Sequence, residues 1–238
     1  LQSIFSSIKE KKEKLIKSGR LKRLRKYPAI ATSKFPKLPR NWSYCRLQDL
    51  TVFGPRNGYS PKGVEYPTQV RSITLTATTS GKFNGNHFKY IDEAIEPESH
   101  LWLQPGDILI QRSNTLIYVG TAAVYDQEPN KFIYPDLIMR IRVASAIDPH
   151  YIHLVLNSRD SKKYFQESAS GTSGTMPKIN QSIVNGLIIP LPPLAEQKRI
   201  VAKVDELMQL CDQLEASLRR QQGRAEALAA AAVSGLAA

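Results

Sequence analysis

The last part of the chain carries a regular stripe of apolar side chains. They recur at alternating spacings of four and three residues, at Ile200, Val204, Leu207, Cys211, Leu214 and Leu218. The same frame continues to residue 232, and a repeat of this length is typical of a coiled-coil seam rather than of a one-sided surface helix. Because Pro192 and Pro193 are compatible with a helix start, we predict one long helix within residues 191–238. An apolar seam this long needs a partner, so its residues are predicted to form a subunit interface.

Residues 41–190 have a different pattern, in which short β-rich runs alternate with turn-forming sequences such as Gly54-Pro55 and Asn84-Gly85. Strands are predicted over residues 70–78, 107–111, 116–124, 132–143 and 187–190. One helix is predicted around residues 149–166, where apolar residues can share a face. The pattern indicates an α+β fold: an irregular, β-rich domain followed by the long coiled-coil helix. The loops that connect its strands are the expected binding surface.

The N-terminal segment is predicted to contain a shorter helix and a linker. Leu1, Phe5, Ile8 and Leu15 follow helical spacing, and Ser18-Gly19 is a plausible stop. Residues 20–40 are basic, contain three prolines and show no periodicity, so we interpret them as an extended linker. For most of its lysines a solvated surface strap is the favoured interpretation, with contact to a DNA backbone as a secondary role.

The net charge of +12 favours a polyanionic partner, but the charge is unevenly distributed. Residues 1–40 hold 13 Lys and Arg against only Glu10 and Glu13, whereas the remaining 198 residues hold 20 basic and 19 acidic side chains. The basic surplus therefore belongs to one segment. The β-rich domain must be judged as a nucleic-acid binder on its own residues.

Several classes of protein find little support in the sequence. It contains no G-x-x-x-x-G-K-[ST] phosphate loop, and His150 and His153 have no third ligand nearby to complete a metal site. No apolar run is long enough to span a membrane. The two cysteines fit no metal-ligand spacing and look like small apolar residues in a reducing compartment, which indicates a cytoplasmic protein. We expect a chain that is not itself an enzyme and that binds no metal.

Five segments, which follow one another along the chain in the same order as in the family, resemble parts of the specificity subunits of type I restriction–modification systems. The run IIPLPPLAEQKRIVAKVDEL over residues 188–207 resembles the junction between a target-recognition domain and a conserved helix. Residues 38–42 resemble the domain entry, residues 103–110 its central Pro-Gly-Asp strand, and residues 170–179 the Gly-Thr loop before the exit strand. Residues 13–22 look like the end of a preceding conserved helix. The similarity covers nearly the whole chain.

This resemblance implies a division of labour. Residues 1–19 would end a conserved helix, 20–40 form the basic linker, 41–190 the DNA target-recognition domain, and 191–238 the helix for spacing and docking. The domain would recognise one half of a bipartite site in double-stranded DNA. The partners would be methyltransferase subunits, a possible restriction subunit, and a second recognition domain in cis or by homodimerisation. S-adenosylmethionine, ATP and magnesium would belong to those partner subunits, with no cofactor in this chain.

Base recognition needs hydrogen-bonding side chains on loops that reach a groove, together with basic groups for phosphates. The candidates for DNA contact are Arg56, Asn57, Tyr59, Ser60 and Lys62 in a Gly- and Pro-rich loop, Lys82, Asn84, His87 and Lys89 in a polar segment, Arg112, Ser113 and Asn114 after a buried strand, and Thr172, Ser173, Thr175 and Lys178 in the Gly-Thr loop. Each group has a plain alternative: a solvent-exposed turn, a polar hairpin, an internal ion pair for Arg112, or a flexible connector. Asp107 is expected to orient the turn after Gly106, and the acidic residues 92–98 to face away from DNA.

Two other functions remain open at this stage. The chain could be a coiled-coil interaction module whose domain binds protein instead of DNA. Its nucleic-acid affinity would then depend little on salt, whereas a protein that contacts phosphates loses affinity steeply as salt rises. It could also be a stand-alone nuclease or methyltransferase, which would modify DNA unaided.

Overall fold

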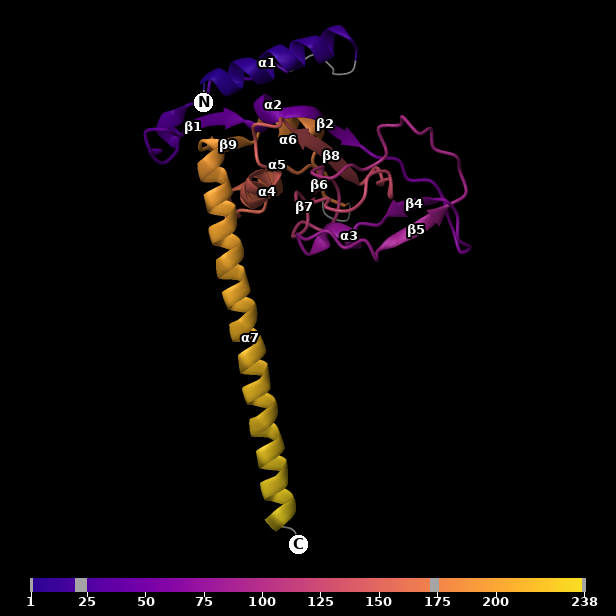
Figure 1. Ribbon diagram of the computed structural model, residues 1–238, viewed down its shortest axis with the longest axis vertical. Coiled ribbons are helices and arrows are strands. Elements are labelled where there is room, and N and C mark those ends of the chain that lie inside the picture. Colours follow the sequence, from indigo (N-terminus) through magenta and orange to yellow (C-terminus); the bar gives the residue numbers. More distant parts are fainter. Residues whose placement is uncertain (1, 20–24, 172–175, 237–238) are drawn as a thin grey trace. The chain divides into compact units, whose positions relative to one another are not determined.

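The computed structural model describes residues 2–19, 25–171 and 176–236, and within these ranges the side chains from residue 5 to residue 228. The chain divides into two compact units, residues 1–197 and 198–238 (Figure 1). None of the helices in these described ranges combines the length and apolar character that a membrane span requires. The α+β class predicted from the sequence is confirmed, with antiparallel sheets in the first unit and one long helix at the C-terminal end.

Three antiparallel sheets build the first unit. The largest has the strand order β2-β8-β6-β7, made of β2 (Thr51–Asn57), β8 (Ile138–Val143), β6 (Ile108–Gln111) and β7 (Ala122–Val124). A three-stranded sheet has the order β3-β5-β4, with strands Gly63–Val64, Phe88–Ile91 and Val70–Ile73. All four residues of β6 are buried, because this strand lies between β8 and β7 in the interior of the unit.

The third sheet joins the start and the end of the domain. β1 (Ser43–Arg46) pairs antiparallel with β9 (Ile188–Leu191), so the entry and exit segments lie side by side. The C-terminal helix begins just after β9, and its buried Gln197 is hydrogen-bonded on both sides. Its Oε1 accepts from Asp148 N at 2.9 Å, and its Nε2 donates to Pro192 O at 2.9 Å. These bonds attach the first turn of that helix to the first unit.

Short helices cover the sheets and begin at side-chain caps. α4 (Pro149–Leu156) starts at Asp148, whose carboxylate accepts from the amides of residues 150 and 151. Ser158 caps α5 (Arg159–Ser168), and Asn180 caps α6 (Gln181–Gly186). The remaining helices are α1 (Gln2–Lys17), η1 (Thr32–Lys34), α2 (Leu47–Leu50), α3 (Thr76–Thr79) and α7 (Leu194–Leu236). α4 packs against β7, and α1 against α2.

Some sequence predictions of elements were wrong in detail. The single helix expected over residues 149–166 is two helices, because Asn157 ends α4 and its side chain bonds both Ala122 N, at 3.0 Å, and Ala122 O, at 2.9 Å. The strand expected over residues 116–124 exists only as β7, since Gly120 has a φ of +75° and a turn precedes it. The run at 132–143 is a strand only from Ile138 onward, and that at 70–78 gives way to α3 after Ile73.

The linker that precedes the domain is an ordered strap over residues 25–42. Tyr27 donates through its hydroxyl to Ser182 O at 2.7 Å, and Tyr44 donates to Pro36 O at 2.8 Å. The guanidinium of Arg46 stacks over the Tyr27 ring at 4.8 Å and donates to Pro28 O at 2.8 Å. Tertiary contacts therefore hold a segment that lacks any periodic pattern of its own.

Candidate nucleic-acid interface

One end of the four-stranded sheet brings two predicted contact segments together. β2 and β6 end there and β8 begins there, because Asn57 pairs with Met139 and Gln111 pairs with Ile138. Arg56 and Asn57 were expected in a loop but are the last two residues of β2. Their position is thus set by strand pairing, which fixes it more firmly than a loop would.

The segment before α6 joins the same end of the sheet. Ile179 N donates to Arg112 O at 2.9 Å, and Lys178 forms an isolated β-bridge with Ser113. Lys178 also exchanges two backbone hydrogen bonds of 2.9 Å with Ser170. We call the group assembled here the sheet-end cluster, which consists of Arg56, Asn57, Arg112, Ser113, Asn114 and Lys178.

The members of the sheet-end cluster differ in how freely they face solvent. Arg56 and Lys178 are exposed, and Arg112 is half-buried with no ion pair among the described residues. Ser113 is fully buried and donates through its hydroxyl to Pro177 O at 3.2 Å, so its side chain holds the loop together. Asn114 donates to Gln111 Oε1 at 2.7 Å.

The rest of the first predicted loop contacts carboxylates of this chain. Tyr59 donates through its hydroxyl to Glu93 at 2.9 Å, which raises the pKa of that phenol, and Ser60 donates to Asp136. Lys62 is exposed. Glu93 belongs to the acidic segment expected to face away from DNA, so Tyr59 is a weaker candidate for a phosphate or base contact than Arg56.

The second predicted group, in the segment 82–89, is only partly free. Lys82, Asn84 and His87 are exposed. Lys89 instead lies in β5, where its ammonium donates to Pro61 O at 2.5 Å. Within the described ranges no hydrogen bond or ion pair joins Lys82, Asn84 or His87 to the sheet-end cluster. The predicted contacts Thr172, Ser173 and Thr175 lie outside the described residues.

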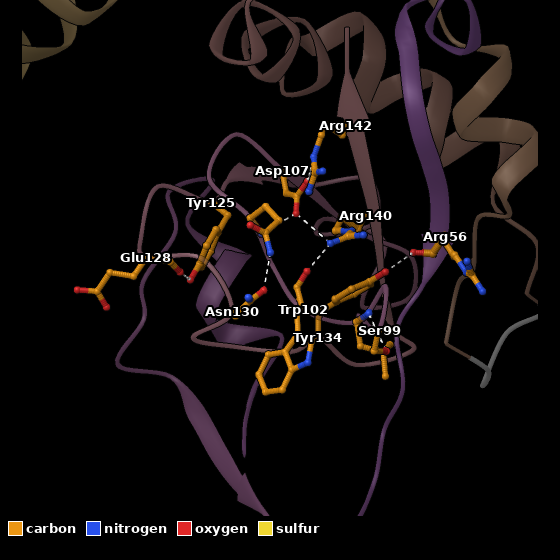
Figure 2. A network of polar contacts seen from close by, with 12 residues as sticks. Arg56, Ser99, Trp102, Asp107, Tyr125, Glu128, Asn130, Tyr134, Arg140 and Arg142 are labelled. Atoms are coloured by element: carbon orange, nitrogen blue, oxygen red, sulfur yellow. Dashed lines mark hydrogen bonds and ion pairs between the residues drawn. The ribbon is translucent and has the colours of Figure 1, made fainter. Parts of the chain in front are cut away.

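A buried ionic network lies beside the end of β2, where Arg140 of β8 pairs with Arg56 (Figure 2). Asp107 is fully buried, and its two carboxylate oxygens accept from Arg140 at 3.0 Å and from Arg142 at 2.8 Å. Asp107 also accepts from Gln104 N at 2.8 Å, which confirms its expected role in orienting the Pro-Gly turn. Arg140 further donates to Trp102 O at 2.6 Å. Neither arginine was predicted from the sequence as a partner of Asp107.

This network reaches the backbone of Arg56 through one tyrosine. The hydroxyl of Tyr134 donates to Arg56 O at 3.3 Å, and the guanidinium of Arg140 lies 5.6 Å from the Tyr134 ring. Burial raises the pKa of Tyr134 to about 12, so the hydroxyl keeps its proton at neutral pH. Figure 2 shows the Arg56 guanidinium pointing away from the network while its carbonyl faces Tyr134. The backbone of Arg56 is therefore held and its side chain is free to bind.

The positive charge near Arg56 comes from arginine side chains and not from the neighbouring His100. Burial lowers the pKa of His100, and the neighbouring charges of Arg56 and Arg140 lower it further, to about 4. His100 is consequently neutral at physiological pH. Elsewhere, a ring nitrogen of His153 lies 2.7 Å from Gly81 O, and within the described ranges no three His, Cys, Asp or Glu side chains gather where they could hold a metal ion.

The predicted seam of α7 lies open in the second unit. Leu207 is 49% exposed, Leu214 57% and Leu218 64%, and Cys211 is exposed as well. Ile200 and Val204 are half-buried. Nothing within the described part of the chain covers the seam from Leu207 onward.

Two features that the sequence analysis missed had signals in the sequence. Arg140 and Arg142 alternate with apolar residues in the run IMRIRV, so both project from the same face of a strand. Basic residues on one face of a buried strand require a carboxylate partner, and Asp107 was available. The exposed run Leu116-Ile117-Tyr118 was assigned to a strand because its apolar side chains fit one.

Comparison with known proteins gives a consistent result. A family model described as the type I restriction modification DNA specificity domain matches residues 39–222. The specificity subunit of the type I restriction enzyme EcoEI from Escherichia coli is 26% identical over 225 residues, which cover 92% of this chain and 38% of that protein. The EcoAI specificity subunit, also from Escherichia coli, is 28% identical over 220 residues, 89% of this chain and 36% of that protein. The chain thus spans less than two fifths of the length of these relatives.

Solved structures share the fold. The HsdS subunit from Thermoanaerobacter tengcongensis aligns with a TM-score of 0.52 at 16% identity, over 90% of this chain and 47% of that chain. A chain from a structure concerning complex assembly and conformational transition of the type I R-M system aligns with a TM-score of 0.58 at 19% identity, over 95% of this chain and 50% of that chain. At these identities the similarity shows the fold alone.

Proposed function

Because this chain belongs to the type I restriction–modification DNA specificity family, we propose that its first unit recognises one half of a bipartite site in double-stranded DNA and that α7 docks methyltransferase subunits. The proposed role is non-catalytic. S-adenosylmethionine, ATP and magnesium would be bound by the partner subunits, including a restriction subunit where one is present. The complex would act in the cytoplasm, where its DNA substrate is found.

The observation that carries the DNA proposal is the sheet-end cluster. It places two arginines, two asparagines and a lysine at one end of a single sheet, although they come from three separate segments. Arginine pairs in bidentate fashion with guanine and asparagine with adenine, while lysine contacts phosphates. The sheet-end cluster combines these groups on backbone segments that strand pairing holds in place. It therefore has the chemistry that direct base recognition requires.

The exposed seam supports the docking proposal. α7 has 43 residues, which corresponds to about 65 Å at 1.5 Å per residue. That length equals about 19 base pairs at 3.4 Å each, more than one turn of duplex DNA. A helix of this length that pairs with another long helix could separate two recognition domains by a fixed distance. The second domain would be supplied in cis or by a second copy of the chain.

The test is a binding selection on randomised DNA sites, performed on the chain with its methyltransferase subunit. Arg56→Ala and Arg112→Ala are each expected to relax base preference at individual positions, because a lost bidentate contact reduces discrimination by about 1 to 3 kcal/mol. Arg219→Ala, which removes an exposed arginine of α7, is the matched control and should leave base preference unchanged. Mapping methylated sites in cells would give the same motif independently.

Unchanged base preference in both Arg56→Ala and Arg112→Ala would contradict the assignment of these two arginines. The alternative of a protein-binding module without DNA binding makes a separate prediction, namely little dependence of DNA affinity on salt concentration. A phosphate-contacting protein instead shows a steep linear fall of log affinity with log salt.

A further inference from the structure

Three consecutive apolar side chains project from the connection between β6 and β7. Leu116 is 48% exposed, Ile117 73% and Tyr118 38%, whereas the next residue, Val119, is fully buried. We call residues 116–118 the apolar tip. A folded domain rarely leaves contiguous apolar side chains in water, and such a patch usually marks a binding surface.

The backbone of the apolar tip is held by hydrogen bonds, so its exposure does not reflect a loose loop. Tyr118 N donates to Thr115 O at 2.9 Å, and the side chain of Gln166 donates to Leu116 O at 3.2 Å. Gly120 N donates to Gln111 O at 2.9 Å, and this hydrogen bond joins the end of the connection to its start.

The chain reversal after the tip requires glycine. Gly120 has a φ of +75°, and a Cβ at this position would overlap the ring of Phe165 in α5. Because Gly120 is packed against a helix in this way, the tip is presented in a fixed orientation. A preorganised apolar projection loses little entropy when it binds.

The surroundings of the apolar tip are suited to DNA. The tip begins two residues after Asn114 and four after Arg112, both members of the sheet-end cluster. Lys178 bridges to Ser113 in the same connection, and the ammonium of Lys162 donates to Thr121 Oγ1 just after the tip. In contrast, no carboxylate forms a hydrogen bond or an ion pair with residues 112–121 among the described residues. Basic and amide groups around an apolar projection complement duplex DNA, in which a negatively charged backbone surrounds stacked bases.

On the basis of the proposed DNA recognition, we propose that the apolar tip is a wedge that enters the duplex at a base-pair step beside the bases contacted by Arg112 and Asn114. Ile117, the most exposed of the three, would enter the step, with Leu116 and Tyr118 against the flanking sugars and bases. Inserted aliphatic side chains partly unstack a step and kink the duplex. Pyrimidine–purine steps deform most easily, so the tip would add sequence preference without a hydrogen bond to a base.

The test uses the full chain in complex with its methyltransferase subunit and a duplex that carries the site found by selection. 2-Aminopurine, an adenine analogue, replaces each adenine of either strand in turn, because its fluorescence rises when it is unstacked. The wild-type complex should show enhanced fluorescence at one step next to the position that Arg112 specifies. Ile117→Ala should remove that signal and weaken binding about tenfold, since it loses most of a buried aliphatic side chain.

A matched control separates this effect from a general loss of surface area. Tyr66→Ala removes a 54% exposed aromatic side chain that donates to Asp92 and lies outside the sheet-end cluster. It should leave affinity and fluorescence unchanged. A methyltransferase extrudes its own target base, so the diagnostic signal is only the one that Ile117→Ala removes.

The outcomes distinguish this inference from the function on which it rests. If Ile117→Ala leaves affinity and fluorescence unchanged while Arg56→Ala still alters base preference, the wedge is wrong and DNA recognition stands. If Ile117→Ala instead weakens only the association with the methyltransferase subunit, the tip is a protein contact and the wedge is again wrong. If the wild-type complex shows no sequence-dependent binding, both proposals fall.

Discussion

At the scale of single residues, a buried carboxylate between two arginines is the most demanding feature of the domain. Asp107 and Arg140 are almost fully withdrawn from water, and Arg140 Nε and one terminal nitrogen of Arg142 have no hydrogen-bond partner in the described residues. Removing one partner from such a network is strongly destabilising, because it leaves a buried charge uncompensated. Because Tyr134 links it to Arg56, the network also bears on the position of a candidate base contact.

Replacing Asp107 should therefore be severe. Asp107→Asn keeps the shape of the side chain but leaves the buried Arg140 without a counter-charge. We expect the free energy of unfolding in urea to fall by about 3 to 5 kcal/mol. Glu128→Gln is the control, because Glu128 pairs with Lys131 at the surface, where a salt bridge contributes about 1 kcal/mol or less. A loss below 1 kcal/mol for Asp107→Asn would show that the network does not stabilise the domain.

Lys12 provides a second buried charge, with a pH dependence of its own. It is 3% exposed in α1 and donates to Gln48 O. Burial lowers the pKa of Lys12 from 10.5 to about 8, although the nearby Asp49 opposes this shift. Between these two pH values the folded state has released the proton and the unfolded state still binds it. This group therefore makes the fold more stable as pH rises from 8 to 10.5, and the gain is lost as pH falls back to 8.

At neutral pH the buried, protonated ammonium of Lys12 destabilises the folded state, and Lys12→Met removes this charge. We expect the variant to unfold at a free energy about 1 to 3 kcal/mol higher than the wild type at pH 7, with the difference shrinking toward pH 10.5. Denaturation at the two pH values measures both effects. Lys14→Met, at an exposed position of the same helix, should show neither. A difference for Lys12→Met that does not change with pH would contradict the assignment.

At the scale of elements, α7 is a helix whose apolar seam has no partner within the described chain. Propensity and surface ion pairs such as Lys203–Glu206 contribute only tenths of a kcal/mol each. Most of the stability of long helices comes from packing of an apolar face. The exposed seam therefore supports the proposal that α7 is completed by association.

Charged substitutions in the seam should block that association. Leu207→Asp and Leu214→Asp would bury an unpaired carboxylate in an apolar interface, and we expect the affinity for the partner helix to fall by roughly a hundredfold or more. Light scattering reports the assembly state, and the near-ultraviolet spectrum of the tryptophans reports folding of the first unit. Gln209→Asp, an exposed position outside the seam, should have little effect. An unaltered complex in either seam variant would show that association uses another surface.

At the scale of the whole molecule, the basic surplus of residues 1–40 and the proposed base contacts lie in different segments. Lys34, Lys37 and Arg40 of the strap are exposed and form no ion pair among the described residues. The sheet-end cluster also holds three cationic residues, Arg56, Arg112 and Lys178, but it combines them with hydrogen-bonding amides. This separation predicts that affinity and specificity respond to different substitutions.

Neutralising the strap should thus lower affinity without changing sequence preference. For Lys34→Gln, Lys37→Gln and Arg40→Gln combined, we expect a modest loss on every DNA sequence. The slope of log affinity against log salt should become shallower by less than about 2.7, the value for three full phosphate contacts. Titrations at several salt concentrations measure it. An altered base preference in this variant would mean that the strap contacts bases.

The sequence by itself determined the features that repeat locally. The four-three spacing from Ile200 to Leu218 predicted α7, because a helix places such residues on one face whatever surrounds it. The family was likewise evident from short segments in a fixed order. Boundaries within the β-rich domain were less accurate, since Asn157 and Gly120 end their elements through contacts with distant residues.

Only the tertiary structure decided which side chains meet. Asp107 binds an arginine 35 residues away, and Lys178 reaches Ser113 from across the domain. Those pairings depend on strand order and register, which no local pattern encodes. The tertiary structure also decided which predicted DNA contacts can reach a ligand. Ser113 is buried and Lys89 donates to a carbonyl, whereas Arg56 faces outward. The sequence shows which side chains have the chemistry to bind a ligand. Strand pairing and packing determine which of them lie close enough together to bind the same ligand.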